Sequence, residues 1–180
     1  RNVMQSRETG VPSGRPHETK DLFVVVFDLI NFVQFSNSSE SWQIFETLNE
    51  FYALSKKAVE FNEGKLIKFI GDAGLCSFEK EKADKAVLAM MGLKDFVDKW
   101  FGEKVKNGGL AVNCHFGPVT IGKMVSGSGE SMDIIGSTVN TAFTLGRKQF
   151  LISPQEFRTL SPETRKKFKK YTPPIVYKLA

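Results

Sequence analysis

The sequence predicts an α+β fold in which helices pack on an antiparallel sheet. Short apolar runs occur in pairs separated by turn residues, and two long segments between them repeat apolar residues every three or four positions. At 180 residues, of which 41% are hydrophobic, the chain is long enough for one substantial core. We therefore expect a single domain.

The first predicted strand covers residues 22–27, an unbroken apolar run rich in valine that ends at Asp28. Such a run is typical of a strand buried on both faces. Further along, residues 66–70 and 74–78 flank a turn, so we expect a tight hairpin with Asp72 at its tip. Both aspartates are thus predicted at the ends of strands.

Two long amphipathic helices are expected, at residues 38–62 and 82–105. Asn37 and Glu40 are placed to cap the first helix, and the Asn-Gly-Gly at 107–109 is typical of a helix end. The predicted buried faces are Trp42, Phe45, Leu48, Tyr52 and Val59 in the first helix, and Ala86, Met90, Leu93, Val97 and Trp100 in the second.

The second half of the chain predicts shorter elements. We expect another hairpin that turns at Gly117 and Pro118. Its strands would be residues 110–115 and 119–124, followed by a flexible segment at 126–129, a helix at 137–147 and a final strand at 176–179. Long helices that alternate with hairpins suggest an antiparallel sheet with helices on one face, related to the ferredoxin-like plan.

The N-terminal residues indicate where the folded domain begins, and the cysteines indicate the redox compartment of the protein. Residues 1–20 lack apolar periodicity and predict a disordered linker or leader, so the folded domain is expected at 21–180. The two cysteines lie in apolar runs, which favours a reducing compartment and hence a cytoplasmic domain. No run approaches the roughly 20 apolar residues that span a bilayer. Whether a longer protein is membrane-anchored is left open.

The formal net charge of +5 is concentrated near the C-terminus. Such a lysine-rich run is usually a solvated helix end, and no aromatic residues alternate with these bases. An RNA-binding domain of this plan would also need exposed aromatic residues on its sheet, and the valine-rich strands do not predict them. Nucleic-acid binding is therefore not expected. The bases in question are Arg165, Lys166, Lys167, Lys169, Lys170 and Lys178.

Several polar residues lie where they could carry chemistry. Asp28 and Asp72 would come together if their strands are neighbours, and carboxylate oxygens suit Mg²⁺ or Mn²⁺. Taken singly, each is more often an ordinary turn residue. Lys68 is placed either to extend from a sheet edge or to donate to a purine nitrogen. Asp133 and Asn140 taken alone are ordinary polar surface residues.

Four motifs, taken in their order along the chain, indicate a protein family. From about Asp21 to its C-terminus the sequence resembles the class III adenylate and guanylate cyclases. Any one motif is weak, but all four in the family's order are specific. They are FDLINF at 27–32, GKLIKFIGDA at 64–73, HFGPV at 115–119 and DIIGSTVNTA at 133–142.

The resemblance implies a two-metal site for a nucleoside triphosphate. Asp28, Asp72 and the backbone carbonyl of Leu29 would hold two Mg²⁺ or Mn²⁺ ions. Backbone N–H groups at the start of the first long helix, with Asn31 and Phe32 beside them, would bind the triphosphate.

The resemblance also assigns base recognition and catalysis. Lys68 and Asp133 would read adenine, and Asn140 would act in catalysis. The metal-binding and base-reading residues would come from different chains, so the resemblance implies a homodimer with ATP at its interface.

The sequence departs from the family pattern at three places. Thr144 stands where the family usually has an arginine four residues after the asparagine, and losing one such charge donor typically costs about a hundredfold in rate. Arg147 would lie one helical turn further on, either reaching back into the site or solvated at the helix end. Asn31 replaces a usual glycine and tolerates positive φ, while Val33 stands where threonine is common. The arm at 126–132, which the family uses in dimerisation, is short.

The resemblance, together with its departures, leads to two hypotheses of function. The first is an adenylate cyclase that converts ATP to 3',5'-cyclic AMP and pyrophosphate, controlled by an upstream sensor or regulatory domain in a longer protein. The second, which Thr144 motivates, is a dimerising nucleotide-binding module with little or no turnover.

Overall fold

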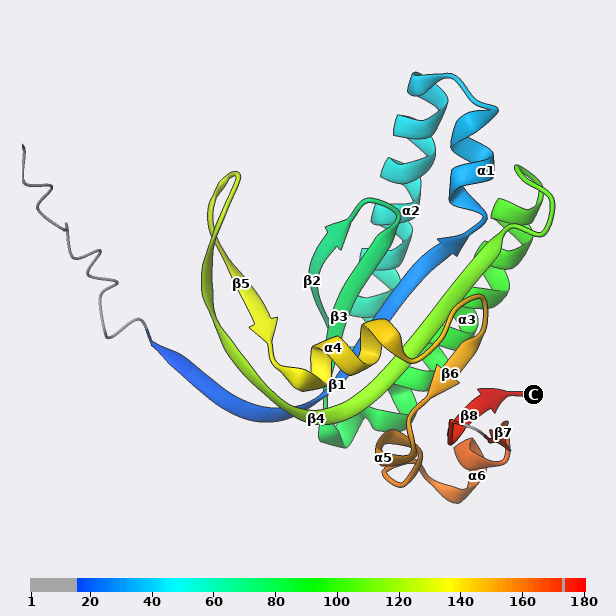
Figure 1. The fold of residues 1–180 in the computed structure, drawn as a ribbon. Coiled ribbons are helices and arrows are strands. Elements are labelled where there is room, and N and C mark those ends of the chain that lie inside the picture. Colours follow the sequence, from blue (N-terminus) through cyan, green and yellow to red (C-terminus); the bar gives the residue numbers. More distant parts are fainter. Residues whose placement is uncertain (1–15, 173) are drawn as a thin grey trace, which may run out of the picture.

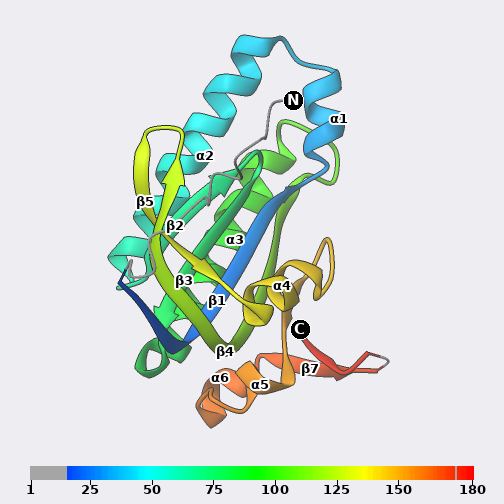
Figure 2. The ribbon, with the colours of Figure 1, turned by 60° about the vertical axis from the view of Figure 1, so that its left-hand side comes forward.

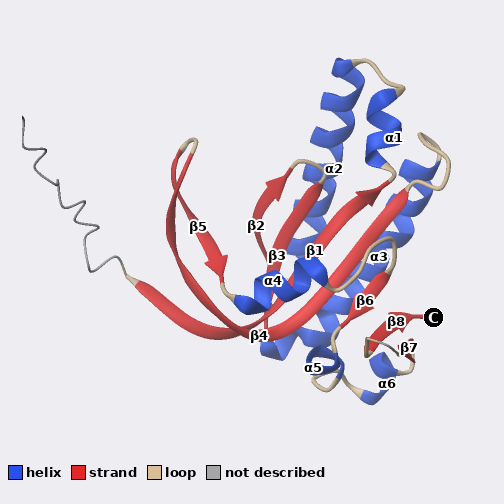
Figure 3. Cartoon of the chain, in the orientation of Figure 1, coloured by secondary structure: helices blue, strands red, loops and turns tan. Residues whose placement is uncertain are grey.

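The computed structural model describes residues 16–172 and 174–180, which form one eight-stranded sheet with helices on both faces (Figures 1 and 3). Along the sheet the strand order is β2-β3-β1-β4-β6-β8-β7, and β5 pairs with β4. Neighbouring strands are antiparallel except β4 and β6, which run parallel. The elements are β1 (His17–Ile30), α1 (Phe32–Asn37), α2 (Ser41–Phe61), β2 (Lys65–Ile70), β3 (Ala73–Glu79), a 3₁₀ turn (Lys80–Lys82), α3 (Ala83–Gly102), β4 (Gly109–Ser126), β5 (Gly129–Ile135), α4 (Ser137–Thr144), β6 (Phe150–Ile152), α5 (Pro154–Phe157), α6 (Pro162–Arg165), β7 (Phe168–Tyr171) and β8 (Val176–Leu179).

The predicted α+β class is confirmed, and β1 is buried on both faces as expected. Its residues alternate between two cores because successive strand side chains point to opposite faces. Phe23, Val25 and Phe27 belong to the larger core under α2 and α3, whereas Val24 and Val26 belong to a smaller core under α4. The helices thus cover both faces and not one (Figure 2). Asp28 continues the alternation of Val24 and Val26 and therefore lies on the α4 face.

The hairpin predicted at Gly117 and Pro118 is wrong. β4 runs unbroken through this point and pairs with β1 along the whole length of β1. A Cβ atom on Gly117 would lie 2.7 Å from the Thr138 hydroxyl, and the Pro118 carbonyl accepts a 2.7 Å hydrogen bond from that hydroxyl. The glycine and the proline therefore let α4 approach the strand closely, and they do not turn the chain.

The boundary expected at Asp21 also changes. β1 begins at His17, and residues 17–20 pair with residues 119–122 of β4. These four residues belong to the domain because the long β4 strand gives them a hydrogen-bonding partner. The rest of the predicted linker, residues 1–15, lies outside the described residues.

The first long helix differs from the prediction at its start and on its buried face. Residues 32–37 form the separate helix α1, and Glu40, not Asn37, caps α2 through a capping box with Gln43. The fully buried residues of α2 are Thr47, Phe51, Ser55 and Val59. Trp42 and Phe45, predicted to be buried, are 64% and 72% exposed. For α3 the predicted face is confirmed at Ala86, Met90, Leu93 and Val97, which are all buried. Trp100, also predicted on this face, is only partly buried, and the helix ends at Gly102.

The remaining elements were predicted in part. The expected flexible segment at 126–129 is the tight turn of a hairpin, in which residues 120–126 of β4 pair with residues 129–135 of β5. The final strand at 176–179 is confirmed as β8. No helix in the described ranges combines the length and the apolar composition needed to cross a membrane.

Candidate functional site

Asp28 and Asp72 come together because β1 and β3 are neighbours in the sheet. Asp28 stands opposite Ala73 in the antiparallel register, next to Asp72 in the β2–β3 turn. The Leu29 amide donates a 3.3 Å hydrogen bond to the Asp72 carbonyl and fixes the turn against β1. Both carboxylates and Leu29 line one cavity of about 490 Å³. The predicted convergence of the two aspartates is therefore present.

The electrostatics of this cavity suit a cation. Loss of solvation, and then the neighbouring Asp72 carboxylate, raise the pKa of Asp28 to about 6, and Arg147 partly opposes the rise. Burial likewise raises the pKa of Asp72. No cluster of three or more His, Cys, Asp or Glu ligands occurs in the described part of the chain. Two carboxylates with a backbone carbonyl fit a hard cation that completes its shell with phosphate oxygens and water, as Mg²⁺ usually does.

Asn31 and Phe32 line the same cavity at the turn from β1 into α1. Asn31 has φ 64°, the left-handed conformation expected for a residue in place of glycine. Its side-chain amide donates to the carbonyls of Lys106 and Asn107, both at 3.2 Å, which ties this turn to the α3–β4 loop. The backbone groups beside the aspartates thus belong to the short helix α1. The expectation that the long helix supplies them is wrong, because that helix begins only at Ser41.

Tyr52 was predicted only as a core residue, but it supports the turn that carries Asp72. Its hydroxyl donates a hydrogen bond to the Gly71 carbonyl, and its ring stacks on Phe69 with centroids 3.9 Å apart. Burial and the Asp72 carboxylate raise the pKa of Tyr52, so the hydroxyl stays protonated and able to donate. A tyrosine at a half-buried helix position facing a predicted turn was the available sequence signal.

We expect Tyr52→Phe to weaken Mn²⁺ binding by roughly tenfold, because supporting contacts around a metal ligand typically carry that much affinity. The ring stack on Phe69 is kept, so the melting temperature should change little. Calorimetric Mn²⁺ titration measures the effect, with Tyr171→Phe on the exposed β7 strand as the matched control. Unchanged Mn²⁺ affinity in Tyr52→Phe would show that the Asp72 turn does not depend on this hydrogen bond.

Lys68 and Asp133, the predicted base-reading pair, are in contact within one chain. The Lys68 ammonium lies 2.6 Å from the Asp133 carboxylate. A β-bulge in β2 creates this geometry, because the register with β3 shifts between Leu66 and Lys68 so that Lys68 stands opposite Leu75 on the α4 face. The hydrophobic pattern alone did not reveal the bulge.

Asn140 and Arg147 are separated by the end of α4. Asn140 is exposed on the helix, and the Thr144 hydroxyl donates back to the Asn140 carbonyl at 3.0 Å. The helix was predicted to run to 147 but ends at Thr144, so Arg147 lies in the following loop and lines the Asp28–Asp72 cavity. Asn140, Lys68 and Asp133 are not among the lining residues of that cavity. One chain therefore presents two separate groups, the carboxylate half (Asp28 and Asp72) and the predicted base-reading half (Lys68 and Asp133).

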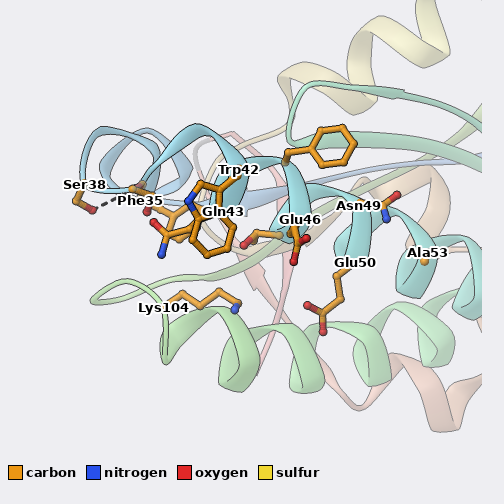
Figure 4. Close-up of a pocket in the computed structure, with 12 residues that line it drawn as sticks. Phe35, Ser38, Trp42, Gln43, Glu46, Asn49, Glu50, Ala53 and Lys104 are labelled. Carbon is orange, nitrogen blue, oxygen red and sulfur yellow. Dashed lines mark hydrogen bonds between the residues drawn. The ribbon is translucent and has the colours of Figure 1, made fainter.

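A larger groove, about 760 Å³, lies elsewhere, between α2 and the loop after α3 (Figure 4). Figure 4 shows Trp42, Glu46 and Glu50 along α2 facing Lys104 from the loop after α3. Both glutamates are exposed on their helix face, and none of the predicted site residues lines this groove. Its size alone does not make it the chemical site.

Comparisons with known proteins bear on the family and the fold of this chain. The adenylate cyclase of Anabaena cylindrica is 26% identical over 132 residues, which cover 69% of this chain. The matched region spans only 26% of that relative. The adenylyl cyclase CyaB from P. aeruginosa superposes with a TM-score of 0.77 at 18% identity, covering 92% of this chain and 96% of the other.

A second solved structure is the guanylate cyclase domain of RhGC from Catenaria anguillulae in complex with GTP. It superposes with a TM-score of 0.76 at 18% identity, covering 91% of this chain and 98% of the other. At such identities these structural matches establish the fold alone. The sequence model of the adenylate and guanylate cyclase catalytic domain matches residues 15–165, most of the chain. The chain therefore belongs to the family of adenylate and guanylate cyclase catalytic domains.

Proposed function

We propose that the domain is an adenylate cyclase, which converts ATP to 3',5'-cyclic AMP and pyrophosphate at a homodimer interface. The observation that carries the proposal is the pairing of Asp28 with Asp72 in one cavity, together with the separate Lys68–Asp133 pair on the same face of the sheet. The first pair suits metal-bound phosphate, and the second suits an adenine edge. The reaction is attack of the ribose 3'-oxygen on the α-phosphorus, with pyrophosphate as the leaving group.

The carboxylate half would hold the phosphates. Asp28, Asp72 and the Leu29 carbonyl are the groups that would bind two Mg²⁺ or Mn²⁺ ions. Such ions, when bound, neutralise phosphate charge and lower the pKa of the attacking hydroxyl. Asn31 and Phe32 would place their backbone beside the phosphates, and the side-chain hydrogen bonds of Asn31 to the α3–β4 loop keep that backbone in place. Positioning and charge neutralisation are then the main contributions to rate.

The base-reading half would select adenine. The Lys68 ammonium can donate to adenine N1, and the Asp133 carboxylate can accept from the 6-amino group. Guanine presents a carbonyl at position 6 and a protonated N1, so both contacts would be mispaired at a cost of about 1–3 kcal/mol each. Asn140, on the helix that follows β5, would contact the reacting part of the nucleotide from this half.

A homodimer accounts for the two separate halves. Each active site would take its carboxylate half from one chain and its base-reading half from the partner, so that a single chain has no complete site. We place the domain in the cytoplasm, where ATP is available and where the two buried free cysteines stay reduced. We also propose a sensor or regulatory domain upstream in a longer protein.

The direct test measures cyclic nucleotide formation with ATP or GTP, with Mg²⁺ or Mn²⁺, over a range of protein concentration. Conversion of ATP that rises more than linearly with protein concentration supports a homodimeric adenylate cyclase. Preferential conversion of GTP would contradict the assignment of Lys68 and Asp133. No product, despite dimers and bound ATP, would favour the second function below.

The second candidate is a dimerising nucleotide-binding module with little turnover. Thr144 motivates it, because its hydroxyl is engaged with the carbonyls of Asn140 and Thr141 and carries no charge for the transferring phosphorus. The module would bind ATP and report nucleotide state to another domain.

We expect Thr144→Arg to raise turnover by about a hundredfold, because one preorganised charge donor is typically worth that factor. The measurement is kcat for ATP in the variant and in the unmodified protein, with Thr141→Arg, one turn earlier on α4, as the control. A large rise from a near-zero baseline favours the binding module as the native function. No rise in an already active enzyme would mean that another group supplies this charge.

A further inference from the structure

The loop between α4 and β6 places two bases over the carboxylates of its own chain. α4 ends at Thr144 and β6 begins at Phe150. Between them, Arg147 and Lys148 are exposed, and both line the cavity that contains Asp28 and Asp72. Two positive side chains thus lie beside two carboxylates without a partner chain.

Asn113 in β4 holds this loop to the sheet. It stands opposite Val26 in the register with β1, so its side chain lies on the face that carries Asp28. The Asn113 amide nitrogen donates a 2.9 Å hydrogen bond to the carbonyl of Gly146, the residue before Arg147. The side chain is 7% exposed, and its Oδ1 atom has no hydrogen-bond partner among the described residues. The side-chain hydrogen bond of Asn113 is therefore made to the α4–β6 loop.

The backbone of the loop is fixed at two further points. A Cβ atom on Gly146 would lie 2.1 Å from the end of the Leu151 side chain, so a larger residue here would have to displace that side chain. Lys148 has φ 63°, a left-handed conformation that is unfavourable for lysine. Such a conformation persists when its surroundings determine it. The direction in which Arg147 and Lys148 leave the backbone is therefore set by the fold.

The charges on these residues match a metal-bound polyphosphate. Arg147 offers planar, paired N–H donors suited to phosphate oxygens, and Lys148 adds a point charge. With Asp28 and Asp72 occupied by metal ions, the cavity would carry excess positive charge that only an anionic ligand balances.

We propose that Arg147 and Lys148 bind the polyphosphate of the nucleotide in cis, from the chain that supplies Asp28 and Asp72, and that Asn113 positions them through the Gly146 carbonyl. The proposal rests on the proposed function for its ligand. It also separates Arg147 from the position of Thr144, because Thr144 and Asn140 are not among the residues that line this cavity. Arg147 is then a binding residue of the carboxylate half and no substitute for the arginine absent at 144.

A binding experiment tests the cis pair without requiring turnover. Inorganic tripolyphosphate is titrated calorimetrically into the full chain with Mn²⁺ present. We expect the double variant Arg147→Ala/Lys148→Ala to bind tripolyphosphate at least tenfold more weakly. The control Lys169→Ala/Lys170→Ala, which removes the same charge from exposed β7, should bind within twofold of the unmodified chain. Equal weakening in both double variants, or none in the first, overturns the proposal.

The role of Asn113 is tested by a double-mutant cycle. Asn113→Ala should weaken tripolyphosphate binding severalfold in the unmodified chain and have no further effect when Arg147 and Lys148 are already alanine. Melting temperatures of all variants identify any loss of folding. Equal weakening in both backgrounds would show that Asn113 acts on the fold in general and would overturn its positioning role.

Mixing experiments distinguish cis from trans directly. Asp72→Ala chains mixed with Lys68→Ala chains should regain one complete site per heterodimer, because the two changes lie in different halves. Asp72→Ala mixed with Arg147→Ala should regain none if Arg147 acts in cis, since no site then has both residues. Restored turnover in that second mixture overturns the cis proposal. If the first mixture does not regain turnover, the proposal of a site shared between two chains is contradicted. The tripolyphosphate titration then still tests whether Arg147 and Lys148 bind phosphate in cis.

Discussion

Asp72→Ala is expected to lower metal-dependent turnover by about 10³-fold, because a bound metal ion contributes several kcal/mol of transition-state stabilisation. Asp72 lies in the β2–β3 turn beside Asp28, and the Leu29 amide fixes its backbone at 3.3 Å. Removing its carboxylate leaves Asp28 as the one acidic side chain among the described residues that line the cavity, so Mn²⁺-dependent nucleotide binding should fall with turnover. Asp28→Ala should behave in the same way. Turnover assays and Mn²⁺-dependent ATP titrations measure both effects.

Asp95→Ala is the matched control, since Asp95 is exposed on α3, on the opposite face of the sheet. It should retain metal-dependent nucleotide binding and the same melting temperature. If Asp28→Ala and Asp72→Ala also retain that binding, the assignment of the metal site is wrong, whatever the turnover of either variant.

Glu156→Gln is expected to stabilise the protein increasingly as pH rises. Glu156 is fully buried in α5, and neither carboxyl oxygen has a hydrogen-bond partner in the described residues. Burial raises the pKa of Glu156 well above its ordinary value, so the folded state keeps the proton at pH values where the unfolded chain releases it. The side chain therefore costs no ionisation energy below about pH 4.5, and stability falls by about 1.4 kcal/mol per pH unit above it.

Stability continues to fall with pH until the raised folded-state pKa of Glu156 is reached. The glutamine variant does not titrate and therefore does not show this fall. Between pH 5 and 7 the difference in unfolding free energy should therefore grow in favour of Glu156→Gln, by at most about 1.4 kcal/mol per pH unit. Urea unfolding at both pH values measures it. Glu163→Gln, an exposed change on neighbouring α6, is the control and should show no such growth. A pH-independent difference for Glu156→Gln would show that Glu156 ionises in the folded protein.

The positions of the two aspartates were predictable because each depends on local sequence. The valine run of β1 has to be buried on both faces, so Asp28 stands out as the first charge after it. The expected strand end at Asp28 was wrong, because β1 continues to Ile30 and Leu29 is buried again. The turn at Gly71 and Asp72 could be predicted from the two apolar runs that flank it. Their convergence then required that β1 and β3 be neighbours, and the register of Asp28 opposite Ala73 shows that they are.

Tertiary contacts account for what was wrong. Gly117 and Pro118 have local turn chemistry, but pairing with β1 keeps the strand continuous, and α4 uses the space that the glycine leaves. The bulge that directs Lys68 toward Asp133 depends on its partner strand β3 and leaves no hydrophobic signature.

The end of α4 was missed although a signal existed. Gly146 is a residue typical of the position just after a helix. Taken as such, it would have ended the helix near Thr144 and placed Arg147 in the loop. Its contact with Asn113, far away in the sequence, could not be predicted from local pattern.

The ion pair between Lys68 and Asp133 has a consequence for selectivity. Because the Lys68 ammonium already donates to the Asp133 carboxylate at 2.6 Å, a base read by these two side chains would meet a pair that is already in contact. It has to exchange with an existing contact. A base edge that offers an acceptor to Lys68 and a donor to Asp133 can replace the ion pair by two new hydrogen bonds. A base edge with the opposite arrangement of donor and acceptor cannot, and the ion pair then stays intact. Discrimination would then arise from competition with the protein's own salt bridge, and the wrong base would be excluded before it binds.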